Sequence, residues 1–148
     1  MKRIYMTEQM RDAIRKIRLT EEEILQASNE IYDILRGDVA TAERYRGRDY
    51  IIQVPERKVG KTYNLIKIAA ETGYPVIVHN SAWGDNLKRE AKKKYGWNIK
   101  VISYRSIPMF IDGMKSNVML KDEKVNIVDV RDRLNDGGLN WVSVVGIN

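Results

Sequence analysis

Pro55-Glu56-Arg57-Lys58-Val59-Gly60-Lys61-Thr62 joins an apolar run to a helical pattern in this chain of 148 residues. The run before it, Asp49 to Val54, is rich in β-branched and aromatic residues and ends at a proline, which predicts a buried strand. From Thr62 to Thr72 the apolar residues share one broad face, and Gly73 with Pro75 then predicts the end of a helix. The segment therefore connects a strand to a helix.

This segment matches most of the phosphate-binding pattern G-x-x-x-x-G-K-[ST]. In such a loop, backbone N–H groups surround the phosphates of a nucleoside triphosphate, the lysine neutralises their charge, and the hydroxyl reaches Mg²⁺. We therefore expect ATP and Mg²⁺ as cofactors, bound by Val59, Gly60, Lys61 and Thr62, with Thr62 also a metal ligand. Pro55 replaces the first glycine, which stiffens the loop and removes one N–H. The alternative interpretation is an ordinary turn that carries a surface lysine.

The composition fits a single hydrophobic core and narrows the chemistry. With 43% hydrophobic residues, the chain can bury a core without covalent cross-links. It has no cysteine and one histidine, His79, which excludes disulfides and thiolate metal sites and disfavours zinc. Neither a membrane-spanning run nor an N-terminal signal core is recognisable. We therefore expect a cytoplasmic protein with no membrane association.

The net charge of +6 arises entirely after residue 49, where sixteen basic residues face ten acidic ones. Much of the excess lies in a helix predicted from Asp85 to Tyr95, on Lys88, Arg89, Lys92, Lys93 and Lys94. Such a face is expected to bind phosphates of DNA or RNA, with stacking candidates nearby in Trp83, Tyr95 and Trp97. A solvated helix face with aromatic residues packed beneath it is the alternative.

The first 48 residues predict a helical hairpin. One amphipathic helix is capped by Thr7, and a second begins with a capping box of Thr20 and Glu23 and ends at Gly37. Residues 40–48 have the character of a charged connector. The hairpin is expected to pack against the core or against a protein partner, and the oligomeric state stays open.

Beyond the loop, strands and helices are predicted to alternate. The expected strands are 75–80, 100–104, 125–130 and 141–147, with a short helix at 106–113. This order predicts an α/β fold at 49–148, with a mostly parallel five-stranded sheet flanked by helices, and the helical hairpin with its connector at 1–48. Ligands of such sheets bind at the carboxyl ends of the strands.

Asp129 would end the predicted strand 125–130, where a Mg²⁺-binding aspartate is expected together with Thr62. The next residue is Val130, so the water-orienting glutamate that often follows is missing. The pair Asp122-Glu123 precedes this predicted strand, and we place it at the opposite edge of the sheet. Alternatively, Asp129 caps a helix.

These motifs together carry a family resemblance. The loop 57–62, the run 76–80 and the run 127–129 resemble the P-loop ATPase core of phage and viral proteins, and are most similar to terminase-like and helicase-like ATPases. The resemblance covers residues 49–148 and implies a five-stranded P-loop NTPase-like core that hydrolyses ATP while acting on nucleic acid. It also implies catalytic roles for Arg57, Lys61 and Asp129, with Arg57 as a charge-stabilising finger.

Two functions remain open from the sequence. The first is an ATP-binding P-loop protein acting on or with nucleic acid, whose hydrolysis is weak or depends on a partner because the glutamate is missing. The second is a non-catalytic, remodelled P-loop fold. It would serve as a phage-encoded inhibitor or accessory protein that binds a protein or nucleic-acid partner.

Overall fold

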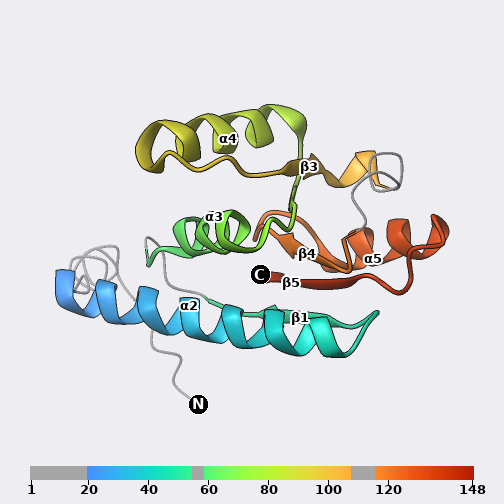
Figure 1. The fold of residues 1–148 in the computed structure, drawn as a ribbon, viewed down its shortest axis with the longest axis horizontal. Helices are drawn as coiled ribbons and strands as arrows, with labels where there is room; N and C mark the ends of the chain where they lie inside the picture. The colour runs from blue at the N-terminus through green and yellow to red at the C-terminus, as the bar shows by residue number, and fades with distance from the viewer. Residues whose placement is uncertain (1–19, 55–58, 108–115) are drawn as a thin grey trace, which may run out of the picture.

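The computed structural model describes residues 20–54, 59–107 and 116–148, and this part of the chain is an α/β fold around one sheet (Figure 1). The strands are β1 (Asp49–Ile52), β2 (Val76–Val78), β3 (Val101–Ser103), β4 (Val118–Lys121) and β5 (Ser143–Ile147). They form a five-stranded sheet in the order β1-β5-β4-β2-β3, and every neighbouring pair is parallel. The expected α/β class with a parallel five-stranded sheet is confirmed.

Helices cover both faces of this sheet. They are α2 (Glu21–Arg44), α3 (Lys61–Thr72), α4 (Ser81–Tyr95) and α5 (Ile127–Asp136), with a 3₁₀ turn η1 (Tyr104–Ser106). Helices α2, α3 and α4 pack on one face and α5 on the other (Figure 1). Strand β4 shows the alternation, because Val118 and Leu120 pack with the first group and Met119 with α5. Within the described ranges, none of the helices has the length and apolar character needed to cross a bilayer.

Helix α2 begins as predicted but ends later. Its capping box is present: Thr20 Oγ1 accepts from the Glu23 N–H at 3.1 Å, and Glu23 Oε1 accepts from the Thr20 N–H at 3.3 Å. The predicted end at Gly37 and the predicted connector from residue 40 are wrong, because the helix continues to Arg44. A glycine within a helix costs only about 1 kcal/mol. Burial of residues beyond it, such as Val39, offsets that cost.

The strand predicted at 125–130 is also wrong, since Ile127–Asp136 forms helix α5. Asn126 starts this helix by accepting the Val128 N–H at 2.8 Å. Val130 and Leu134, four residues apart, are its buried face. The β-branched residues have a local propensity for strand, but the apolar face that packs against the sheet stabilises a helix.

Other predictions were met in part. Strands were expected at the positions of β1, β2, β3 and β5, and each is shorter than predicted. Helix α4 begins at Ser81 instead of Asp85, because Asn80 caps it by accepting the Trp83 N–H at 2.7 Å. The predicted helix over 106–113 and the predicted helix capped by Thr7 lie largely or wholly outside the described residues.

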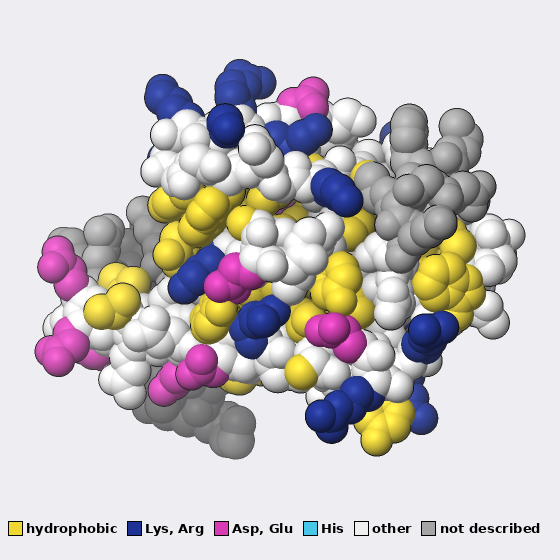
Figure 2. All heavy atoms as spheres, in the orientation of Figure 1, with side chains coloured by type: hydrophobic (Ala, Val, Ile, Leu, Met, Phe, Trp, Pro, Cys, Tyr) yellow, Lys and Arg dark blue, Asp and Glu magenta, His cyan; other side chains and the backbone are white. Residues whose placement is uncertain are grey.

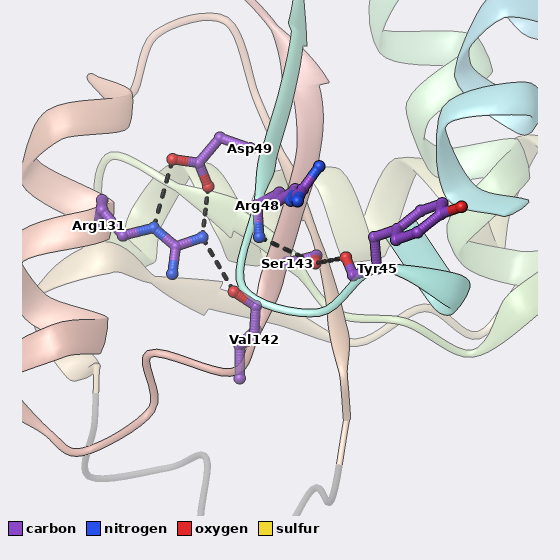
Figure 3. Close-up of polar contacts among 6 residues, drawn as sticks. All are labelled: Tyr45, Arg48, Asp49, Arg131, Val142 and Ser143. Atoms are coloured by element: carbon purple, nitrogen blue, oxygen red, sulfur yellow. Dashed lines mark hydrogen bonds and ion pairs between the residues drawn. The ribbon is translucent and has the colours of Figure 1, made fainter. Parts of the chain in front are cut away.

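A polar cluster fixes the amino ends of β1 and β5 (Figure 3). Arg131 of α5 forms a two-pronged ion pair with Asp49 of β1 and also donates to the Val142 carbonyl at 2.9 Å. Ser143 donates to the Tyr45 carbonyl at 3.0 Å, which links β5 to the end of α2. These contacts join both helical layers to the sheet.

Candidate functional site

The lysine of the loop contacts Glu123, the second residue of an acidic pair at the end of β4. Lys61 opens α3, and its Nζ donates to the Val54 carbonyl at 2.8 Å and to Glu123 Oε2 at 3.0 Å. Its side chain is only 11% exposed, against 36% for Glu123. Residues from two separate strands therefore meet at one edge of the sheet.

Asp122 and Glu123 lie at the carboxyl end of β4, which corrects their predicted place at the opposite edge. The error followed from the misplaced strand at 125–130. Asp129 instead lies in the first turn of α5 and lines a surface hollow with Tyr104 and Arg133. Among the described residues, no hydrogen bond or ion pair joins Asp129 to Lys61 or Thr62. A usable signal for Asp122 existed in the apolar run 118–120, but Lys121 interrupts it.

Asp122 is a buried carboxylate with an unsatisfied oxygen. It is 4% exposed, and its Oδ2 has no hydrogen-bond partner in the described ranges. Burial raises the pKa of Asp122; the Glu123 carboxylate adds to the rise, while the Glu123 N–H, the Trp83 indole and Lys121 oppose it. A carboxylate oxygen left without a donor at a protein interior is suited to accept a proton or bind a cation.

Lys121 holds the backbone that carries this acidic pair. Its side chain is fully buried, and its Nζ donates to the carbonyls of Asp122 at 2.9 Å, Val125 at 2.6 Å and Ile147 at 2.7 Å. Burial lowers the pKa of Lys121 to about 8, against the opposing carboxylates of Asp122 and Glu123. Gly146 is its partner on β5, where an added Cβ would lie 2.4 Å from the Lys121 carbonyl oxygen. The absence of a side chain at Gly146 thus leaves room for Lys121 beside β5.

The end of β2 adds aromatic groups next to the acidic pair. The rings of His79 and Trp83 are 6.2 Å apart, and Lys124 Nζ lies 4.8 Å from the Trp83 ring. Neither His79 Nδ1 nor Trp83 Nε1 makes a hydrogen bond of normal geometry within the described part of the chain, although the Trp83 indole lies near enough to the Asp122 carboxylate to lower its pKa. Strands β2 and β4 are neighbours in the sheet, and the chain continues from them to opposite sides, from β2 to β3 on one side and from β4 to β5 on the other. Their carboxyl ends therefore form a topological switch point, where open α/β sheets bind ligands.

Gly60 supports the loop through its backbone conformation. It caps α3 with φ of +79°, which favours glycine. Helix α2 also approaches it, because a Cβ on Gly60 would lie 2.5 Å from Ser28 Oγ. Ser28 accepts two hydrogen bonds from Asn64 Nδ2, at 2.8 Å through its carbonyl and 3.1 Å through its hydroxyl. The glycine of the motif is therefore required by its backbone conformation and by the close approach of Ser28.

Gly60→Ala is expected to destabilise the protein more than Gly73→Ala does. Both glycines have φ of +79°, but only Gly60 has an atom within 4 Å of the added Cβ. The conformational cost is about 1–2 kcal/mol at each position, so the difference between the two variants isolates the contact with Ser28. Urea unfolding of both variants measures this difference. Equal losses would show that α2 adjusts freely around the loop.

The remaining predicted loop residues are placed as follows. Val59 is buried in the core with α2 and α3, so its side chain packs while its backbone borders the loop. Thr62 is half-buried in the first turn of α3. Pro55 and Arg57 lie outside the described residues.

The predicted basic face of α4 is solvent-exposed. Its members are Lys88, Arg89, Lys92, Lys93 and Lys94. Figure 2 shows Lys and Arg side chains gathered over α4, at the top of the view. Lys94 pairs with Glu90 at 2.6 Å, while Leu87 and Ala91 are buried on the opposite side of the helix. The structure thus shows an exposed basic face, as both interpretations of the sequence require.

Comparisons with protein-family models, curated proteins and solved structures found no match. The class that the structure defines is therefore α/β, with a parallel five-stranded sheet and a polar switch point. Over residues 20–54, 59–107 and 116–148, no three or more histidine, aspartate or glutamate side chains gather as a ready metal site.

Proposed function

We propose that the protein binds a nucleoside triphosphate with Mg²⁺ at the carboxyl ends of β1 and β4, and acts with it on nucleic acid. The observation that carries this proposal is the contact of Lys61 with Glu123, beside the unsatisfied oxygen of Asp122. This contact brings the loop lysine, at the N-terminus of α3, to the Glu123 carboxylate, and Asp122 precedes Glu123 directly at the end of β4. A phosphate at the start of α3 would also meet the free N–H groups and the positive end of the helix dipole.

Each residue has a distinct role in this proposal. Lys61 exchanges Glu123 for phosphate oxygens when the nucleotide binds. Thr62 and Asp122 supply oxygen atoms to Mg²⁺, which commonly takes few protein ligands and completes its shell with phosphates and water. Glu123, released from Lys61, orients the attacking water. Arg57 stays a prediction as the charge-stabilising finger.

This assignment removes the reason to expect weak hydrolysis. That expectation rested on Val130 following Asp129, and Asp129 lies on α5. Asp122-Glu123 supplies the aspartate and the glutamate in the expected order after β4. For nucleic acid, the exposed basic face of α4 is the proposed contact with phosphates. ATP binding without turnover would instead support a nucleotide-dependent switch.

Calorimetric titration with MgATP tests the proposal. Lys61→Ala is expected to weaken binding about 100-fold, because a charge-assisted contact to phosphate contributes about 1.5–3 kcal/mol. Lys67→Ala is the matched control, since Lys67 lies on the same helix but over the Tyr32 ring, 4.3 Å from its centre. Equal affinities of the two variants, or no binding by the wild-type protein, would overturn the proposal. Circular dichroism confirms that both variants are folded.

A further inference from the structure

Three aromatic rings form a cluster beside the candidate phosphate loop. Tyr95 and Trp97 stack with ring centres 4.5 Å apart and planes 25° apart. Tyr63 contacts Tyr95 edge-on at 5.4 Å and lies 6.0 Å from Trp97. The cluster joins the first turn of α3 to the end of α4, and Tyr63 directly follows Thr62.

Two of these rings are more exposed than core packing requires. Tyr63 is 37% exposed and Tyr95 is 42% exposed, while Trp97 packs partly against the core. A chain turn at Gly96, with φ of +73°, brings Tyr95 and Trp97 onto each other. Of the three rings, Trp97 is the one that packs against the core of the described residues, so core packing does not account for the two exposed tyrosines.

The surroundings of the cluster are strongly basic. Lys92, Lys93 and Lys94 form the last turn of α4, directly before Tyr95, and all three are exposed. Among the described residues, Lys94 pairs with Glu90, and no acidic side chain pairs with Lys92 or Lys93. Lysines at a helix C-terminus also interact favourably with the helix dipole. That interaction explains a basic turn but not the exposed rings next to it.

We propose that Tyr63, Tyr95, Trp97 and the basic turn 92–94 bind a single-stranded nucleic acid, with its bases stacked on the rings and its phosphates on the lysines. Aromatic rings stack on unpaired bases of any sequence, whereas a duplex keeps its bases stacked on one another. The favoured ligand is therefore a single strand. This inference specifies the nucleic acid in the proposed function and rests on that function only for the coupling to ATP. Since Tyr63 adjoins Thr62, a bound strand lies next to the start of α3.

Fluorescence anisotropy tests this surface with labelled 15-nucleotide oligo(dT), oligo(U) and a mixed-sequence 15-base-pair DNA duplex, all without ATP. The wild-type protein is expected to bind a single strand at least 10-fold more tightly than the duplex.

Tyr95→Ala should lose about 10-fold or more in single-strand affinity with an unchanged salt slope, and Tyr95→Phe should keep most of that affinity. Replacing Lys92, Lys93 and Lys94 with Gln should reduce the slope by about 2, at roughly 0.7 per phosphate contact. Tyr45→Ala is the control, because Tyr45 is 55% exposed at the far end of α2.

The outcomes separate this inference from the nucleotide proposal. Equal affinities of Tyr95→Ala and Tyr45→Ala, or a duplex bound as tightly as the single strands, would overturn the stacking surface. Tyr95→Ala should still bind MgATP as the wild-type protein does, which also shows that the variant is folded. Single-strand binding by a wild-type protein that does not bind MgATP would support this surface and refute the nucleotide site.

Discussion

Glu123→Gln is expected to bind MgATP at least as tightly as the wild-type protein and to hydrolyse it about 10²- to 10⁴-fold more slowly, the usual contribution of a general base. The amide keeps the size of the side chain but cannot take a proton from water. Tight binding should persist because the variant removes the carboxylate that competes with phosphate for Lys61. Phosphate release at saturating MgATP, with and without single-stranded DNA, measures the turnover.

Asp129→Asn is the matched control for this experiment. Asp129 was the metal ligand expected from the sequence, whereas the structure places it on α5 beside Tyr104 and Arg133. Its substitution should leave both binding and turnover unchanged. The opposite pattern, with turnover lost in Asp129→Asn and kept in Glu123→Gln, would reject Asp122-Glu123 as the acidic pair of the site.

The parts of the fold that local chemistry determines could be predicted from the sequence. The capping box at Thr20, the strand before the loop and the helix that ends at Gly73 each depend on residues a few positions apart. Such patterns act through turns, caps and periodicity, which are local. The sequence therefore predicted the loop between β1 and α3 in its correct place.

The acidic pair could not be placed in the same way, because its position depends on contacts that are distant in sequence. A lysine after three apolar residues does not favour a buried strand end. Lys121 is tolerated there because carbonyls from β5 and from the turn before α5 accept hydrogen bonds from its Nζ. The β-branched run 125–130 has a high local propensity for strand, so the sequence pattern predicted the strand there instead of at Val118–Lys121. The cap at Asn126 and the packing of Val130 and Leu134 against the sheet instead make Ile127–Asp136 a helix.

Lys61 and Glu123 are likewise far apart in the sequence, 62 positions from each other. The two residues meet at one edge of the sheet because β1 and β4 run parallel on either side of β5, and this strand order does not follow from the spacing of residues along the chain. The motif thus specified the ligand class that we propose, and strand order specified the partners. Lys121 holds the strand end that carries Glu123 through its hydrogen bonds to the carbonyls of Asp122, Val125 and Ile147, which we call the Lys121 clasp.

Lys121→Met is therefore expected to lower the free energy of unfolding by about 3 kcal/mol. Methionine approximates the apolar stem of lysine but leaves the carbonyls of Val125 and Ile147 without this donor, and each unsatisfied buried acceptor costs about 1–3 kcal/mol. The Asp122 carbonyl keeps the Val125 N–H at 3.2 Å, so its loss is smaller. Urea unfolding measures the change, with the exposed Lys100→Met as control. Replacing a buried charge by an apolar side chain can be neutral when its partner is replaced too. A loss below about 1 kcal/mol would show that the carbonyls find other donors.

The stability difference between the wild-type protein and Lys121→Met should depend on pH, which is a second test of the Lys121 clasp. Burial lowers the pKa of Lys121 from 10.5 to about 8. Between these values the unfolded chain holds a proton that the folded chain has released, so unfolding takes up a proton and the stability of the wild-type protein rises with pH. Relative to Lys121→Met, which lacks the group, the wild-type protein should gain stability from pH 8 to 10.5, by at most about 1.4 kcal/mol per pH unit. Below pH 8 the difference between the two proteins should be constant. A difference that falls with rising pH would mean that the three carbonyls hold the lysine charged, and that the clasp is an ionic one.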